Sequence, residues 1–145
     1  MIRVLTILDT NVVSEPMRPS PSLVVLAWLS ESHERGPLFV TTITVAEILL
    51  GIELLPRGKR RDQLLARAEA AFAEDFAGRV LPFDEDAARA FPEIDVRRRA
   101  QGRPIADLDA QIAAIARSRG ALLATRNTDD FEGCGVRLVN PWTGP

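Results

Sequence analysis

Four acidic residues lie where apolar runs end or where helices are expected to begin, and they are the groups in this chain best suited to chemistry. They are Asp9, Glu47, Asp109 and Asp130. Carboxylates gathered from distant segments repel one another, so a divalent cation bound through oxygen would neutralise them. Such an ion suits phosphate chemistry, because it polarises a phosphoryl oxygen and activates water. The four acids therefore predict a metal-dependent nuclease.

Each acid also has an ordinary structural explanation. Asp9 could start a turn or cap a helix, because it follows a short apolar run. Thr44 and Glu47 have the spacing of a capping box, in which Glu47 would return to the Thr44 amide. Asp107 is expected to be a helix N-cap, with Asp109 beside it in a first turn where the helix dipole favours acids.

Composition narrows the classes of function. The net charge of −2 gives no global basic field, so any attraction for nucleic acid must come from local patches. The single Cys134 excludes an internal disulfide, and the single His33 excludes two-histidine acid–base catalysis and multi-histidine zinc sites. The first apolar run is too short for a signal peptide, and no stretch approaches the roughly 20 apolar residues of a membrane span. We expect a cytoplasmic protein without a membrane segment.

The order of apolar runs and amphipathic segments predicts an α/β fold. Alternating strands and helices of this length imply a parallel sheet of four to five strands between two helical layers. With no linker or repeat, residues 1–145 are expected to form one domain. The carboxyl ends of such strands are where ligands bind. The expected strands are 4–8, 38–41, 79–83, 121–125 and 136–139; the expected helices are 22–33, 44–55, 59–76, one capped by Asp84 and kinked or split at Pro92, and 107–119, which Gly120 ends.

Four short motifs, in this order, make the chain resemble the PIN-domain nucleases, in particular the VapC-type toxins of bacterial toxin–antitoxin pairs. The first is Leu-Asp-Thr-Asn-Val-Val-Ser at 8–14, and the second is Thr-Ile-Thr-Val-Ala-Glu-Ile at 42–48 with Gly51. The third is the segment 105–114, and the fourth runs from Ala-Thr-Arg-Asn at 124–127 to Phe131, with Asn-Pro-Trp at 140–142. The resemblance covers essentially the whole chain and implies a PIN-like three-layer fold.

The resemblance also implies roles for individual residues. The family's first acid falls on Asp9 and its glutamate on Glu47, and its third acid falls on Asp109, which two intervening residues separate from an Ile-Ala-Ala triplet. The chain departs from the family at the fourth acid, where Asn127 stands and contributes no charge. Asp130, one turn later, could supply the missing carboxylate.

The implied activity is hydrolysis of RNA phosphodiester bonds with Mg²⁺ or Mn²⁺. The implied partners are RNA, a cognate antitoxin that occludes the acidic site, and a second copy of the chain. The antitoxin is expected to lay apolar residues across the helix at 44–55 and to place a cation near the acids. A homodimer could use the apolar face around Leu64 and Phe72. The expected site residues are Asp9 and Asp109 as metal ligands, Asp9, Glu47, Asp109 and Asp130 as catalytic residues, and Thr10, Asn11, Arg126 and Asn127 as substrate contacts.

Other functions remain to be weighed. An aspartyl-phosphate phosphatase needs a second Asp where Asn11 stands, and a signalling receiver needs a late Lys, whereas the only lysine is Lys59. The alternatives that survive are an RNA-processing PIN nuclease without antitoxin and a catalytically weak RNA-binding module. Trp142 is expected to be a core anchor. The basic clusters, expected to be solvated faces or RNA contacts, are Arg57 with Lys59, Arg60 and Arg61, and Arg97 with Arg98, Arg99 and Arg103.

Overall fold

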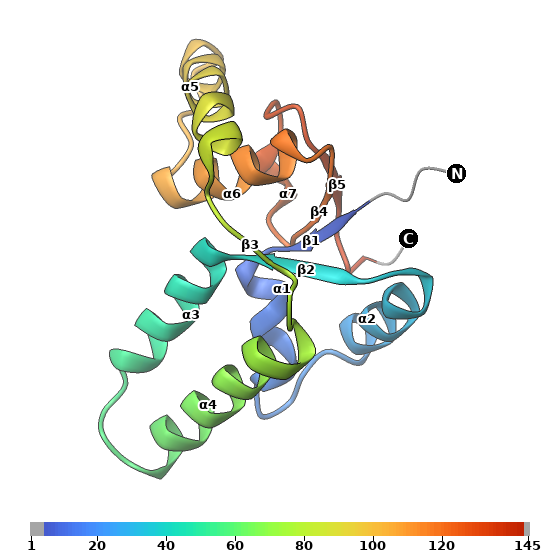
Figure 1. Ribbon diagram of the computed structural model, residues 1–145, viewed down its shortest axis with the longest axis vertical. Coiled ribbons are helices and arrows are strands. Elements are labelled where there is room, and N and C mark those ends of the chain that lie inside the picture. Colours follow the sequence, from blue (N-terminus) through green and yellow to red (C-terminus); the bar gives the residue numbers. More distant parts are fainter. Residues whose placement is uncertain (1–4, 144–145) are drawn as a thin grey trace.

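Five parallel strands form a single sheet in the order β3-β2-β1-β4-β5. The computed structural model describes residues 5–143. Helices α1 to α4 lie on one side of the sheet and α5 to α7 on the other, which confirms the three-layer prediction (Figure 1). The elements are β1 (Thr6–Leu8), α1 (Thr10–Ser14), the 3₁₀ turn η1 (Glu15–Met17), α2 (Leu23–Arg35), β2 (Leu38–Thr41), α3 (Thr42–Glu53), α4 (Lys59–Ala70), the π-helix η2 (Ala71–Asp75), β3 (Val80–Leu81), α5 (Glu85–Ala100), α6 (Asp107–Ser118), β4 (Leu122–Ala124), α7 (Thr128–Phe131) and β5 (Arg137–Val139).

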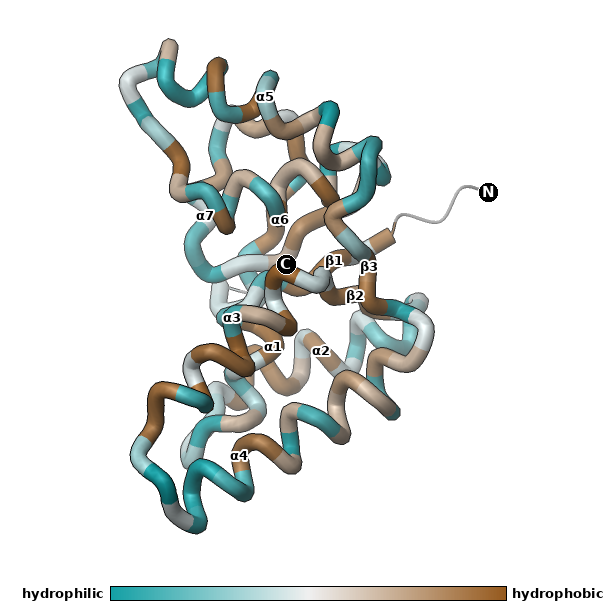
Figure 2. Tube along the Cα trace, turned by 60° about the vertical axis from the view of Figure 1, so that its left-hand side comes forward, coloured by the Kyte–Doolittle hydropathy of each residue, from teal (hydrophilic) through white to brown (hydrophobic). Residues whose placement is uncertain are grey.

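The central strands are apolar on both faces, because each face packs against a layer of helices. Successive side chains of a strand point to opposite faces. Ile7 and Leu123 accordingly pack with α5 and α6, whereas Leu8 and Ala124 pack with α1, α3 and α4. Figure 2 shows this arrangement as hydrophobic colour along the strands, with hydrophilic segments concentrated on the outer helices and loops. The strands are therefore fixed between two separate cores.

Several boundaries differ from those expected. The helix predicted over 59–76 ends its regular part at Ala70 and continues as the π-helix η2. Pro92 lies inside α5 without dividing it. Its side chain is exposed, so the ring meets solvent and the helix loses only one hydrogen bond. Gly120 follows α6 with φ +61°, a left-handed conformation that ends a helix at little cost for glycine, as predicted.

The strand order reverses at β1, and this reversal creates the position for a site. From β1 the chain moves to β2 and β3 on one side and then returns to β4 on the other side. Crevices for ligands form beyond the carboxyl ends of strands at such a switch point. The amide of Asp9 donates to the carbonyl of Ala124 at 2.8 Å, so the ends of β1 and β4 are held together there. Among residues 5–143, none of the helices has the length and apolar content needed to cross a membrane.

Candidate active site

Asp9 lies at the end of β1, where it is the N-cap of α1. Its carboxylate accepts hydrogen bonds from the Thr10 amide at 2.8 Å and from the Thr125 hydroxyl at 2.7 Å. The residue is only 5% exposed. Burial raises the pKa of Asp9; the two hydrogen bonds oppose that rise, and the nearby charges of Glu47 and Asp130 add to it. The expected helix cap is present, and the same carboxylate lies within the field of two other acids.

Glu47 reaches the same region from the second turn of α3. Its Oε1 accepts a hydrogen bond from the Thr10 hydroxyl at 2.9 Å, and that hydroxyl also lies 2.9 Å from the Thr44 hydroxyl. The capping-box prediction is wrong, because α3 begins earlier and Thr41 is its N-cap, accepting from the Thr44 amide at 3.2 Å. Glu47 therefore does not cap α3, and its carboxylate points toward α1, where it accepts the hydrogen bond from Thr10.

Asp109 enters from the first turn of α6. Burial, and after it the charges of Asp9, Asp130 and Glu47, together raise its pKa to about 6, while the charge of Arg98 opposes the rise. The interpretation of Asp107 as N-cap is wrong: Ala106 is at that position, and Asp107 is an exposed first helical residue. The half-turn between the two acids therefore turns Asp109 inward and leaves Asp107 in solvent.

The small residues that follow Asp109 explain how α6 comes so close. Ala110, Ala113, Ala114 and Ala116 are fully buried. Short side chains allow a helix to approach a sheet closely, so the first turn of α6 projects over the strand ends. This face packs on the sheet, because these alanines share one core with Ile7 of β1.

The two candidates for the fourth acidic position are Asn127, which precedes α7, and Asp130, which lies within it. Asp130 is exposed, and its charge contributes to the raised pKa values of Asp109 and Asp9, in which burial is the largest cause. Asn127 is the N-cap residue of α7 but makes no side-chain capping bond; its amide donates to the Thr125 hydroxyl at 3.1 Å. Asp130 therefore lies within the electrostatic field of the other acids, whereas Asn127 contacts the site through its main chain.

Thr125 is a site residue that the sequence reasoning did not single out. It is fully buried, donates to Asp9, and accepts from the Asn127 amide and from the Asn11 side chain, the last at 3.4 Å. A polar residue at the end of a parallel strand next to β1 was the available signal. One threonine hydroxyl thus connects the ends of β1 and β4 directly below the acids.

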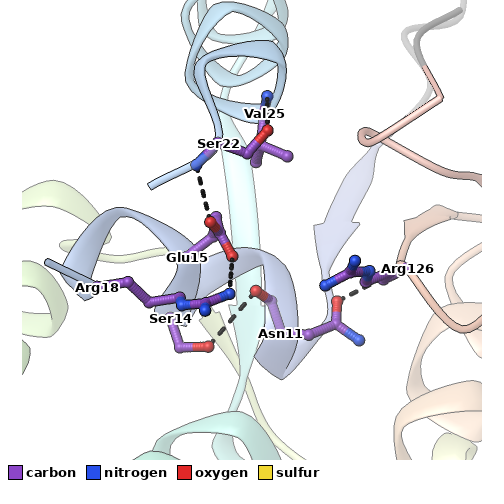
Figure 3. Close-up of polar contacts among 7 residues, drawn as sticks. All are labelled: Asn11, Ser14, Glu15, Arg18, Ser22, Val25 and Arg126. Carbon is purple, nitrogen blue, oxygen red and sulfur yellow. Dashed lines mark hydrogen bonds and ion pairs between the residues drawn. The ribbon is translucent and has the colours of Figure 1, made fainter. Parts of the chain in front are cut away.

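Asn11 links the acids to the basic rim. Its side-chain Nδ2 donates weakly to Asp9 at 3.4 Å, and its side-chain Oδ1 accepts from the Arg126 amide at 3.2 Å (Figure 3). The Arg126 guanidinium lies 5.1 Å from the ring centre of Trp142, within the range of a cation–π contact. Trp142 is half-buried against the core, as expected for an anchor. Arg126 is thereby held at the mouth of the site.

Glu15 fixes the far end of α1. It is 4% exposed and accepts from the Ser22 amide at 2.8 Å and from Arg18 at 3.2 Å (Figure 3). The hydrogen bond from Ser22 lowers the pKa of Glu15, burial opposes this, and Arg18 and more distant Arg126 lower it further. Sequence reasoning missed Glu15. Its buried carboxylate anchors the loop before α2 and so steadies the helix that carries Thr10 and the N-cap Asp9.

The acids would bind a divalent cation through two carboxylates and water. Within residues 5–143, no three His, Cys, Asp or Glu side chains gather closely enough to hold a metal ion by themselves. Mg²⁺ usually keeps several waters and binds proteins through one or two carboxylates. Asp9 and Asp109 fit that pattern, because both are oxygen donors whose pKa values are raised, first by burial and then by the charges of neighbouring acids. Glu47 and Asp130 would then act through water.

A groove of about 520 Å³ leads away from the acids between α3 and α4. Thr10 and Glu47 form its inner end. Apolar side chains line its length, and two arginines lie beside them. These lining residues include Ile48, Ile52, Leu55, Leu64, Arg18 and Arg60.

Comparisons with known proteins agree with this fold. The family model described as PIN domain matches residues 6–134. The chain is 40% identical to the VapC ribonuclease Y4jK of Sinorhizobium fredii, over 94% of this chain and 96% of that protein. It is 43% identical to the Toxin FitB of Neisseria gonorrhoeae, over 94% of this chain and 97% of that protein. Among solved structures, FitAB bound to a DNA fragment superposes with a TM-score of 0.86 at 40% identity, covering 95% of this chain and 96% of that one.

Proposed function

This chain belongs to the PIN-domain family, and from that premise we propose that it is a Mg²⁺- or Mn²⁺-dependent endoribonuclease and the toxin of a toxin–antitoxin pair. RNA and a cognate antitoxin would be its partners, and the cytoplasm would be the compartment where it meets both. The observation that carries the proposal is the burial of Asp9 beside Glu47, Asp109 and Asp130. A divalent cation would offset the repulsion among these acids, which adds to the effect of burial in raising the pKa values of Asp9 and Asp109.

Different residues of the chain would bind the ion, orient its ligands and align water. Asp9 and Asp109 would hold the ion, which when bound polarises the scissile phosphate and activates water. Thr125 and the Thr10 amide orient the carboxylate of Asp9, and the Thr10 hydroxyl orients that of Glu47. Glu47 and Asp130 are left to bind and align water near the reacting phosphate.

Binding of RNA is assigned to the rim of the site. Arg126 is exposed and, within residues 5–143, has no carboxylate at ion-pair distance. Its charge is therefore available to a phosphate. Thr10, Asn11 and Asn127 lie on the path between Arg126 and the acids, and they provide neutral hydrogen-bonding groups that can contact substrate without adding negative charge.

The groove between α3 and α4 supports the antitoxin part of the proposal. A partner segment with apolar side chains would fill the groove, and an arginine at its inner end would pair with the acids bidentately. FitB, which resembles this chain, has been solved in the FitAB assembly. We also propose a homodimer, for which the face around Leu64 and Phe72 stays the candidate contact, because both side chains are only half-buried against this chain's own core.

The decisive experiment measures cleavage of total RNA by purified protein with Mg²⁺ or Mn²⁺. Asp9→Asn preserves shape and should remove cleavage while keeping the thermal transition. Asp107→Asn is the matched control, because Asp107 is exposed in the first turn of α6, and it should cut RNA at the wild-type rate. Cleavage by Asp9→Asn at the wild-type rate would refute the assignment, and RNA binding without cleavage by wild type would favour the RNA-binding module.

A further inference from the structure

An arginine in the last turn of α5 forms hydrogen bonds to the main chain of the segment that carries Asp130. Arg98 is 4% exposed, although it was expected to lie on a solvated face or contact RNA, and that expectation is wrong. Its Nη1 donates to the carbonyls of Asp130 and Glu132, each at 2.8 Å, and its Nε donates to the carbonyl of Arg103 at 2.6 Å. All three acceptors are main-chain oxygens, so the guanidinium fixes backbone position.

The charge of Arg98 opposes the rise that burial causes in the pKa of Asp109 but does not act through a direct ion pair. Within residues 5–143, no Asp or Glu lies at ion-pair distance from it. Burying an unpaired guanidinium costs free energy that an apolar residue of similar size would avoid. Its neighbours Arg97 and Arg99 are exposed, so the position of Arg98 is specific and the run of arginines is not one basic surface.

A second arginine holds the same segment from outside. Arg103 donates to the carbonyl of Asp129 at 2.9 Å and pairs with the carboxylate of Glu132 at 3.1 Å. The main chain at Gly133 lies close to the side chain of Gln101. A Cβ added to Gly133 would be only 2.7 Å from the side-chain oxygen of Gln101. Gly133 also has φ +80°, which glycine tolerates. Three main-chain carbonyls of one short segment are thus held by two arginines of another.

The segment needs this external support. Helix α7 has four residues, and its N-cap Asn127 makes no side-chain capping bond. A helix of one turn has little stability of its own. The position of Asp130 relative to Asp9 and Asp109 therefore depends on what holds its backbone.

We propose that Arg98, assisted by Arg103, is a positioning residue that sets α7 so that the carboxylate of Asp130 reaches the divalent-cation site of Asp9 and Asp109. This inference rests on the proposed function, since it needs a cation site. It assigns the fourth acidic position to Asp130, through water, and leaves Asn127 as a neutral neighbour.

The experiment titrates metal-free, full-length protein with Mn²⁺ in the absence of RNA, by calorimetry. Arg98→Lys keeps the charge but loses the fork that spans two carbonyls, and it should weaken Mn²⁺ binding about tenfold, as changes behind metal ligands do. Asp130→Asn should weaken binding comparably. Adding Arg98→Lys to Asp130→Asn should then change the affinity no further, because the arginine acts through that carboxylate. Arg97→Lys, an exposed neighbour on the same helix, is the control and should bind as wild type.

A purely structural role for Arg98 predicts a different result. Arg98→Lys would then lower the melting temperature with unchanged Mn²⁺ affinity, or would weaken binding equally with and without Asp130→Asn; either result overturns the proposal. If Arg98→Lys does not fold, Arg103→Gln at the exposed member of the pair must show the same dependence on Asp130. Wild-type protein that binds Mn²⁺ but cuts no RNA would refute the proposed function alone, whereas absence of Mn²⁺ binding would overturn both.

Discussion

The hydroxyl of Thr125 donates to the carboxylate of Asp9 at 2.7 Å, across the ends of β1 and β4 and across 116 positions of sequence. The bond is buried, and it connects the acid that directly follows β1 to the residue that directly follows β4. An ionised carboxylate is a strong acceptor, so this contact lowers the cost of keeping Asp9 charged inside the protein.

Thr125→Val should expose the dependence of Asp9 on that bond. Valine has nearly the same shape but leaves the buried carboxylate without its donor, so the free energy of unfolding should fall by about 1–3 kcal/mol. Mn²⁺ binding should weaken too, because the carboxylate loses its orientation. Urea denaturation and metal titration measure the two effects, and Thr125→Ser is the control that restores the hydroxyl. If valine behaves as serine does, the hydrogen bond does not support the site.

The sequence predicted the sheet and the positions of the acids because both follow from local patterns. An apolar run ending in Asp9 indicates a buried strand that feeds a loop, and a helix beginning near Asp109 indicates the second acid. Parallel topology then brings the two ends to one rim. These inferences use neighbours in sequence, which is why they did not depend on details of packing.

The errors arose where several similar residues compete for one position. Thr41 and Thr44 both offer a hydroxyl at the start of α3, and only the observed helix start shows that Thr41 is the cap. Arg98 is one of three consecutive arginines, and the helix turns only that one inward. The role of Thr125 depends on pairing between distant strands. None of these choices is encoded in the spacing of residue types.

The raised pKa of Asp109 predicts how pH changes the stability of the metal-free protein. An acid whose pKa is about 6 when folded, against an ordinary 3.8, binds its proton more tightly in the folded state. Stability should therefore fall as pH rises from about 4 through about 6, with the full loss present above that window. Asp109→Asn should stabilise the protein at pH 7.5 by on the order of 1 kcal/mol, allowing for partial exposure, and should have little effect near pH 4.

Denaturation in EDTA at the two pH values measures this difference. Asp107→Asn is the matched control, because it removes an exposed acid from the same helical turn. It should change stability by no more than about 0.3–1 kcal/mol, the value of a charge near a helix start. An Asp109→Asn protein that is less stable than wild type at pH 7.5 would contradict the prediction.

The contact between Arg126 and Trp142 predicts a measurable contribution to RNA binding. In an Asp9→Asn background with EDTA, Arg126→Ala should weaken binding of single-stranded RNA and reduce the slope of log affinity against log salt by about 0.7, the value of one phosphate contact. Arg126→Lys should keep the slope, because its charge remains. Trp142→Leu should weaken binding less, since it removes only the platform under the guanidinium. An unchanged slope for Arg126→Ala would exclude a phosphate contact.

A substitution in the groove between α3 and α4 can test antitoxin binding separately from RNA cleavage. Gly51 lies on α3 within the groove, and a Cβ at that position would meet no atom within 4 Å. Gly51→Phe should therefore fold and fill the groove without touching Asp9 or Asp109. It should still cleave RNA, yet escape the antitoxin, so that co-expression of the cognate antitoxin no longer restores growth.

Gly51→Ala is the control for this substitution. It adds one methyl group, should stabilise α3 by about 0.8–1 kcal/mol through helix propensity, and leaves the groove open to the partner. Growth should be restored for Gly51→Ala and lost for Gly51→Phe, while Gly51→Ala cuts RNA in vitro at the wild-type rate and Gly51→Phe retains cleavage. Full rescue of Gly51→Phe would mean that the antitoxin binds elsewhere. If wild type itself proves harmless alone and binds no such partner, the toxin assignment fails and an RNA-processing nuclease takes its place.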